Sequence, residues 1–202
     1  MRGRCQRGAL ARADLQYWKV VLQIQAPHLY LEPFLPRRAP LEGCDLACGW
    51  GRICLGLSEY RQRRIHACDL DDSSLRTLRR LSKNRNLEGV IETHRTSILH
   101  LPFENDRIDF FLAFDILTQM TDESLRQCLR ETLRCGKRGC VLYAEVPLKA
   151  YCPAVTHVQN WDHRVLRTFV EGVRAAGKRW RMRQWSPSVP EHFTFVIERD
   201  SR

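Results

Sequence analysis

Short apolar runs alternate with amphipathic stretches along most of the chain. We expect a strand where an apolar run is brief and continuous, and a helix where apolar residues recur every three or four positions. Strands are predicted at residues 41–48, 64–70, 89–95, 108–114, 139–146, 179–185 and 192–198. Helices are predicted at residues 14–25, 52–59, 71–84, 121–133 and 163–176.

The order of these elements predicts the fold. From residue 41, a strand–helix unit is expected five times, followed by a final pair of strands joined by residues 186–190. Strands separated by helices pair in parallel, whereas strands joined by a short connection pair antiparallel. We therefore expect an α/β fold with a doubly wound, seven-stranded and mostly parallel sheet, helices on both faces and an antiparallel last strand.

The stretch from Leu41 to Ile53 carries the clearest functional pattern. It begins as an apolar strand, breaks at Gly49 and Gly51, and restarts as an amphipathic helix. In such a segment, backbone N–H groups at the turn and the helix N-terminus face a nucleotide, and the absent side chains let it approach. A dinucleotide-binding turn also wants a third glycine, but Cys54 takes that position here, which argues against a dinucleotide.

Several segments resemble the motifs of class I S-adenosylmethionine-dependent methyltransferases. Asp45-Leu-Ala-Cys-Gly-Trp-Gly51 resembles motif I, written D-x-G-x-G-x-G, and Asp69-Leu-Asp71 resembles the acidic end of the family's second strand. Leu101-Pro-Phe103, followed by residues 107–117, resembles the L-P-F … F-D-x-V … L segment. Arg130-Glu-Thr-Leu-Arg134, with the glycine at 139, resembles E-x-x-R-x-L-x-P-G-G. The resemblance covers about residues 41–146 and implies the Rossmann-like methyltransferase fold and S-adenosylmethionine as cofactor.

The resemblance also implies roles for the matched residues. Gly49 and Gly51 admit the methionine part of the cofactor, and Asp45 helps orient its amino end. Asp69 accepts hydrogen bonds from both ribose hydroxyls, which suits a carboxylate with two acceptor oxygens. Leu70 packs on the adenine face. The expected cofactor-binding residues are Asp45, Ala47, Cys48, Gly49, Gly51, Asp69, Leu70, Ser97, Ile98 and Phe114.

The sequence departs from the family pattern at three places. Ala47 replaces the first glycine of motif I. Ser97 stands where an acid often contacts the adenine amino group, so a weaker contact is expected. Arg138-Gly-Cys140 replaces Pro-Gly-Gly, which changes a turn and not the chemistry. Ser97 and the altered turn keep open the alternative of a non-catalytic binding or scaffold protein with this fold.

Methyl transfer from a sulfonium mainly requires that the acceptor be positioned and, where needed, deprotonated. The resemblance implies that Phe114 flanks the transferable methyl group and that the substrate binds beyond the fourth and fifth strands. The candidate catalytic acid–base residues are Glu145, His157 and His163. The candidate substrate-side residues are Tyr17, Trp18, Asp115 and Trp161. An ordinary structural role is the alternative for each of them.

The 202 residues include 44% hydrophobic and 28% charged residues, which is typical of one globular domain. We expect a single methyltransferase domain: a basic arm, helix and connector over 1–40, a cofactor-binding core over 41–146, and a substrate-side insertion with C-terminal strands over 147–202. No apolar run approaches the roughly 20 residues of a membrane span. The nine cysteines show no zinc-site spacing, so we expect no metal site. Their odd number, without a secretory signal, favours reduced thiols, and we expect a cytoplasmic protein.

The formal net charge of +10 favours an anionic partner, such as nucleic acid, an acidic protein or a charged substrate. A solvated basic surface is the alternative. Residues 1–12 are rich in arginine. We expect a basic arm there, with an organelle-targeting segment as the alternative.

The segment after the fourth predicted strand bears on the methyl acceptor. Enzymes that methylate amino groups of nucleic acids usually carry Asn/Asp-Pro-Pro-Tyr/Phe there, whereas this chain reads Phe114-Asp-Ile-Leu117. A Pro-Cys loop for cytosine C5 methylation is absent from the sequence as well. We therefore expect an S-adenosylmethionine-dependent methyltransferase acting on an oxygen or nitrogen atom of a small-molecule substrate. A protein or RNA methyltransferase is the alternative that the charge suggests.

Overall fold

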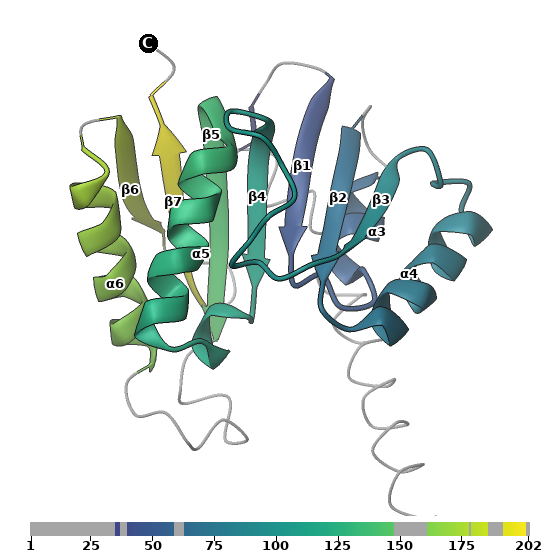
Figure 1. Cartoon of the computed structure of the whole chain (residues 1–202), viewed down its shortest axis with the longest axis horizontal. Helices are drawn as coiled ribbons and strands as arrows, with labels where there is room; N and C mark the ends of the chain where they lie inside the picture. Colours follow the sequence, from purple (N-terminus) through teal and green to yellow (C-terminus); the bar gives the residue numbers. More distant parts are fainter. Residues whose placement is uncertain are drawn as a thin grey trace, which may run out of the picture.

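The computed structural model describes residues 35–36, 40–58, 63–147, 161–177, 179–185 and 192–200 (Figure 1). The helix expected at residues 14–25 lies outside this range. All the predicted strands and the other predicted helices are present, and their ends differ from those expected by a few residues at most.

The strands and helices have the following bounds. The strands are β1 (Leu41–Leu46), β2 (Arg63–Asp69), β3 (Ile91–Arg95), β4 (Ile108–Phe114), β5 (Gly136–Pro147), β6 (Trp180–Trp185) and β7 (His192–Arg199). The helices are α3 (Arg52–Ser58), α4 (Asp72–Asn84), α5 (Asp122–Cys135) and α6 (Trp161–Ala175), with a short 3-10 turn, η1 (Leu117–Gln119).

The strands form one seven-stranded sheet in the order β3-β2-β1-β4-β5-β7-β6. β1 to β5 pair in parallel, whereas β7 runs antiparallel to both β5 and β6 (Figure 1). The predicted fold class is therefore confirmed, including its antiparallel last strand. The chain proceeds from β1 outward through β2 and β3 and then returns to β4 on the other side of β1. Open α/β sheets bind ligands at such a reversal, beyond the carboxyl ends of the strands.

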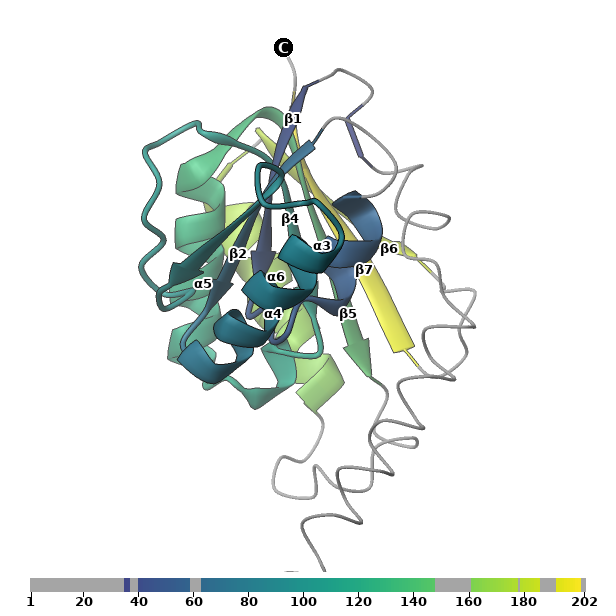
Figure 2. The same cartoon turned by 90° about the vertical axis from the view of Figure 1, so that its right-hand side faces the viewer.

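Helices cover both faces of the sheet (Figure 2). α5 and α6 pack on one face, where Leu125 and Phe169 meet Phe111 of β4. α3 packs on the other face together with Leu78 of α4, and Phe110 of β4 belongs to that second core. Phe110 and Phe111 are adjacent in sequence and both fully buried, because successive strand residues point to opposite faces. The continuous apolar run of β4 is thus buried on both faces of the sheet.

Side-chain caps define where two helices begin. Asp71 accepts hydrogen bonds from the backbone N–H groups of Ser73 and Ser74, at 3.0 and 3.1 Å, before the first turn of α4. Thr121 accepts one from the N–H of Ser124 at 3.2 Å before α5. These oxygens satisfy N–H groups that have no partner inside the helix. The two caps lie at the starts of the helices predicted at residues 71–84 and 121–133.

The expected count of five strand–helix units is wrong by one, because residues 96–107 cross from β3 to β4 as a loop without a helix. α5 holds this loop in place. The Leu101 N–H donates to Glu131 Oε2 at 2.8 Å, and the Arg134 guanidinium donates to the Phe103 carbonyl at 2.8 Å and to the Leu101 carbonyl at 3.2 Å. Pro102 also lacks the N–H that a helix interior would use.

The fifth strand begins at Gly136, directly after α5, and not at Gly139 as expected. Its pairing with β4 shifts register between Ile108 and Phe110. Gly139 has a φ of 74°, in the left-handed region. The polar residues Lys137 and Arg138, which suggest a turn in the sequence, therefore form an irregularity within the strand.

The described cysteines are free thiols. Those at positions 44, 54, 68 and 140 are fully buried among apolar side chains, where a thiol behaves as a small hydrophobe. In the part of the chain that the structure describes, no helix combines the length and the apolar character needed to cross a membrane.

Gly43 in β1 offers a sharp test of the packing between β1 and β4. A Cβ at this position would lie 2.1 Å from Cζ of Phe110, whose ring is fully buried. We expect Gly43→Ala to lower the free energy of unfolding by about 1–3 kcal/mol, because the ring must shift within a close-packed core. Urea unfolding measures this change.

Gly89→Ala is the matched control. A Cβ at Gly89 would meet nothing within 4 Å, so we expect a change within about 0.5 kcal/mol. Equal losses of stability in the two variants would contradict the proposed packing.

Candidate functional site

The predicted cofactor residues meet at the carboxyl ends of β1, β2 and β4. The glycine turn follows β1, Asp69 ends β2 and Phe114 ends β4. β1 lies between β2 and β4 in the sheet, so the three strand ends are neighbours along its lower edge in Figure 1. They line one crevice at the point where the strand order reverses.

The turn after β1 requires left-handed backbone at several positions. Ala47, Gly49 and Gly51 have φ values of 56°, 54° and 89°. The Cys48 N–H donates to the Cys68 carbonyl at 3.0 Å, which ties the turn to β2. For a residue with a side chain, this conformation costs roughly 1–2 kcal/mol. Glycine, which the family carries at the position of Ala47, adopts this left-handed conformation without that cost.

The two glycines of the turn have different surroundings. A Cβ on Gly49 would meet nothing within 4 Å, so this residue borders open space. A Cβ on Gly51 would lie 2.2 Å from Cδ1 of Leu78. Gly49 leaves room for a ligand, whereas Gly51 lets α4 pack against the turn.

Asp69 connects the turn after β1 with the turn after β2. Its Oδ2 accepts a hydrogen bond from the Gly49 N–H at 2.7 Å, and its Oδ1 accepts one from the Asp71 N–H at 2.8 Å. An ionised carboxylate offers about four acceptor positions, so each oxygen retains a lone pair. Asp69 is half-buried. The carboxylate thus fits the two hydroxyls of a ribose while it holds the turns.

The residues expected around the adenine lie beside Asp69. Leu70 is 67% exposed although its side chain is large and apolar. An aromatic base packed on it would remove that surface from water. Ile98 is buried, and the Ser97 hydroxyl oxygen accepts a hydrogen bond from the Leu99 N–H at 3.2 Å. Ser97 therefore already uses an acceptor position within its own turn.

Asp45 lies in β1, just before the glycine turn, and is almost fully buried. Burial raises the pKa of its carboxyl to about 7, although Arg52 and hydrogen bonds with Cys54 favour the ionised form. Its Oδ2 is buried and has no hydrogen-bond partner among the described residues. A buried acceptor without a donor is costly. The amino end of an S-adenosylmethionine molecule would supply that donor, so Asp45 fits the expected cofactor.

A second buried acid lies across the crevice. Glu145 is 6% exposed, near the end of β5, and pairs in register with Phe114 of β4. Burial raises the pKa of Glu145 to about 7, the carboxylate of Asp115 raises it further, and Arg52 lowers it. The Asp115 N–H donates to the Glu145 carbonyl at 3.2 Å.

Arg52 was not among the predicted site residues. It is the first residue of α3, and its guanidinium carbon lies 5.9 Å from the centre of the Phe114 ring. That ring stacks on Tyr143 with 5.6 Å between the ring centres. Arg52 also favours the ionised forms of both Asp45 and Glu145. Its place directly after the glycine turn is the sequence signal that would have found it.

The structure describes only some of the residues expected on the substrate side. Asp115 follows β4 at the crevice and has a φ of 59°. Trp161 and His163 belong to the first turn of α6. Tyr17, Trp18 and His157 lie outside the described residues.

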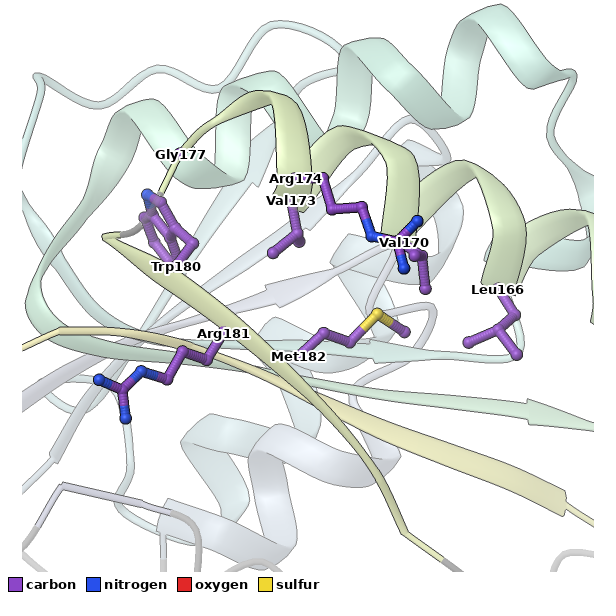
Figure 3. Close-up of a pocket in the computed structure, with 8 residues that line it drawn as sticks. All are labelled: Leu166, Val170, Val173, Arg174, Gly177, Trp180, Arg181 and Met182. Atoms are coloured by element: carbon purple, nitrogen blue, oxygen red, sulfur yellow. The ribbon is translucent and has the colours of Figure 1, made fainter.

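A separate groove of about 670 Å³ lies between α6 and β6 (Figure 3). Trp180 and Met182 of β6 point toward α6 there. The lining residues are Leu166, Val170, Val173, Arg174, Gly177, Trp180, Arg181 and Met182. They include none of the predicted site residues, so this groove is distinct from the crevice.

Two comparisons of the sequence bear on the family. Residues 44–139 match a family model described as a methyltransferase domain. An uncharacterized protein from Haemophilus influenzae is 27% identical over 105 residues, which make up 52% of this chain and 42% of that protein. The chain thus spans less than half the length of this curated relative.

Solved structures with similar folds cover most of the chain. A candidate S-adenosylmethionine-dependent methyltransferase from Methanococcus maripaludis has a TM-score of 0.71 at 14% identity, over 94% of this chain and 92% of that one. A methyltransferase from Aquifex aeolicus that depends on the same cofactor has a TM-score of 0.64 at 17% identity, over 85% and 88%. The cyclase SpnF has a TM-score of 0.64 at 14% identity, over 85% and 79%. At these identities the likeness concerns the fold.

The matched family model covers the glycine turn, Asp69 and Phe114, which the structure brings to one crevice. S-adenosylmethionine is the cofactor that this family implies. The open space beside Gly49, the exposed Leu70 and the unpartnered oxygen of Asp45 fit it. The family-model match over residues 44–139 and the similar folds of the solved structures therefore support the class I S-adenosylmethionine-dependent methyltransferase superfamily for this chain.

Proposed function

We propose that the chain transfers the methyl group of S-adenosylmethionine to an oxygen or nitrogen atom of a small-molecule acceptor, with Glu145 as the base. The observation that carries this proposal is the buried Glu145 carboxyl at the end of β5, whose pKa burial raises to about 7. A base with a pKa near neutral pH combines an ionised population with enough basicity to take a proton.

In the proposed reaction, Asp69, Asp45 and Glu145 each have a separate role. Bound S-adenosylmethionine supplies an activated methyl group, so the protein has to position the acceptor and remove its proton. Asp69 would hold the ribose and Asp45 the amino end of the cofactor. Glu145 would accept the proton that the acceptor atom gives up when it takes the methyl group.

Protein or RNA methylation is a second candidate, which the net charge of +10 favours. Part of the basic surface is already paired within the chain. Arg76 pairs with Asp72, and Arg134 pairs with Glu131. These two arginines are neutralised locally, so a phosphate backbone would have to contact other basic residues of the chain.

A binding protein without methyl transfer is a third candidate. The cyclase SpnF has a similar fold, so this fold hosts more than one chemistry. Ser97 in place of an acid also favours this candidate, since its hydroxyl oxygen already serves the Leu99 N–H.

Methyl-labelled S-adenosylmethionine separates the three candidates. The protein is incubated with the labelled cofactor and, in parallel, with a metabolite extract, total RNA or total protein. We expect label in the metabolite arm and much less of it with Glu145→Gln. Label confined to RNA or protein would replace the small-molecule acceptor. Cofactor binding without transfer in any arm would favour the binding protein.

Asp69→Asn tests the ribose contact. We expect binding of the demethylated cofactor, S-adenosylhomocysteine, to weaken roughly 10–100-fold, because a neutral amide replaces a charged acceptor. Titration calorimetry measures the affinity. Asparagine retains an oxygen that accepts from a backbone N–H, so the turns keep part of their support.

Glu88→Gln is the control for Asp69→Asn, since it removes an exposed charge between α4 and β3. Its affinity for S-adenosylhomocysteine should equal that of the wild type. An unchanged affinity in Asp69→Asn would rule out the ribose role of Asp69.

The raised pKa of Glu145 also makes stability depend on pH. An ordinary glutamate has a value of 4.5, whereas this one has a value of about 7 in the folded protein. Between about pH 4.5 and pH 7, the folded state therefore keeps the proton of Glu145, whereas the unfolded chain releases it. The resulting stabilisation is fully present below about pH 4.5 and is lost as the pH rises through about 7.

Glu145→Gln should remove this part of the pH dependence, which amounts to about 3 kcal/mol, because glutamine stays neutral. Urea unfolding at pH 5 and pH 8 measures the difference in free energy. Asp45 acts in the same direction, so the variant keeps a smaller slope. Glu171→Gln changes an exposed acid on α6 and should leave the slope unchanged. A wild-type slope in Glu145→Gln would mean that Glu145 is not protonated in the fold.

A further inference from the structure

His66, Glu92 and His94 form a cluster outside the cofactor crevice. They lie on the neighbouring strands β2 and β3, where His66 pairs in register with Glu92, and Cys68 with His94. Residues two positions apart in a strand point to the same face. All three side chains therefore meet on the face that also carries Cys68 and α5.

The distances within this cluster are close to those of a metal site. His66 Nδ1 lies 2.9 Å from His94 Nε2. The Glu92 carboxylate oxygens lie 3.8 Å from His66 Nδ1 and 3.7 Å from His94 Nε2. A tetrahedral zinc ion with bonds of about 2.0–2.1 Å separates its ligand atoms by about 3.3–3.4 Å. The two Glu92 distances involve different oxygens, and one ligand atom from each side chain lies within 4.8 Å of the other two. Side-chain movements of at most about 1.5 Å would bring the three donors to the spacing of a zinc site.

Glu42 contacts the ring nitrogen of His66 that faces away from the cluster. Its Oε1 lies 2.8 Å from His66 Nε2 and also accepts a hydrogen bond from the Arg107 guanidinium at 2.7 Å. When His66 donates its Nε2 proton to this carboxylate, its Nδ1 lone pair faces His94 Nε2 and accepts the proton of that nitrogen. A metal ion would take the place of this shared proton. Metal-binding histidines typically have such a carboxylate partner, which fixes the tautomer and the ring orientation.

The surroundings leave one side of the cluster open. The Phe103 ring forms a wall, with its centre 4.8 Å from that of His66 and 5.4 Å from that of His94. The His66 side chain is 5% exposed, whereas that of Glu92 is 46% exposed. Solvent can therefore reach the Glu92 side and supply a fourth ligand to a metal.

Arg64 competes for Glu92, because its guanidinium lies 3.1 Å from Glu92 Oε2. Both side chains are about half exposed, at 55% and 46%. Exposed ion pairs contribute about 0–1 kcal/mol, so this contact is weak beside a metal bond. Arg64 also holds the carboxylate near the histidines before any metal arrives.

We propose that this cluster binds Zn²⁺ through Nδ1 of His66, Nε2 of His94 and one oxygen of Glu92, with Glu42 positioning His66. Two imidazoles and one carboxylate suit a first-row transition metal better than Mg²⁺ or Ca²⁺. Three protein ligands and one open position match a zinc site with a bound water. The ion would join the edge strand β3 to β2 and, through Phe103, restrain the loop over residues 96–107.

Zinc titration of the metal-free full chain tests the proposal. We expect calorimetry to show one Zn²⁺ per chain, together with a rise in melting temperature. His94→Gln and Glu92→Gln each remove a ligand from positions that are only partly buried, so folding should be retained. Each should weaken zinc binding at least tenfold. Glu42→Gln should weaken it 10–100-fold, as expected for a supporting carboxylate.

His100→Gln is the matched control, since it changes an exposed histidine outside the cluster, and its zinc affinity should equal that of the wild type. Circular dichroism of each metal-free variant checks that it is folded. Binding unaffected by His94→Gln, or the absence of binding at micromolar Zn²⁺, would overturn the site. Thiolate charge-transfer bands with Co²⁺ would place the metal on cysteine and overturn it as well. Tighter binding of Fe²⁺ than of Zn²⁺ would overturn the choice of metal.

Discussion

The Asp69 carboxylate is the contact on which the cofactor crevice depends. It accepts one hydrogen bond from the turn after β1 and one from the turn after β2, at 2.7 and 2.8 Å. Hydrogen bonds to an ionised acceptor are stronger than neutral ones. They fix the open space beside Gly49 relative to the exposed Leu70. One acid thus serves the fold and the ligand site, so its loss affects both.

Strain and buried charge gather around this crevice. Ala47 and Asp115 both hold left-handed backbone there, although neither is glycine. Asp45 and Glu145 are buried acids whose pKa values lie near 7 because burial disfavours their ionised forms. Arg52 offsets part of that cost for both acids. Such features lower stability, and proteins tend to concentrate them at functional sites.

The sequence predicts those parts of the fold that a few neighbouring residues decide. The glycine turn, the strand of continuous apolar residues at β4 and the caps at Asp71 and Thr121 are of this kind. The different surroundings of Gly49 and Gly51 were not predictable, because Leu78 of a later helix fills the space beside Gly51. The cluster of His66, Glu92 and His94 also has no spacing signal, since strand pairing assembles it.

Among the site residues too, local sequence predicts the identity of a residue but not its surroundings. The order and spacing of the motifs identified Asp45, Asp69 and Glu145 as residues of interest. Their burial and the resulting pKa values depend on packing across the whole sheet, which local patterns do not encode. Arg52 was missed because its contact with the Phe114 ring joins the start of α3 to the end of β4.

The missing helix between β3 and β4 gives the segment that resembles E-x-x-R a structural role. Glu131 and Arg134 of this segment pair at 2.7 Å and fasten Leu101 and Phe103 through their backbone groups. One end of the fastened loop carries Ser97 and Ile98, where the family places its adenine contacts. Its middle carries Phe103, which packs against the two histidines.

Side-chain hydrogen bonds therefore do here what a covering helix would otherwise do. They leave the loop without the repeated backbone bonds of a helix, so its position depends on a few contacts between its middle and α5. A metal that fixes the rings under Phe103 would act on the same loop that bears the adenine contacts. The edge of the sheet and the cofactor crevice are in this way parts of one connected structure.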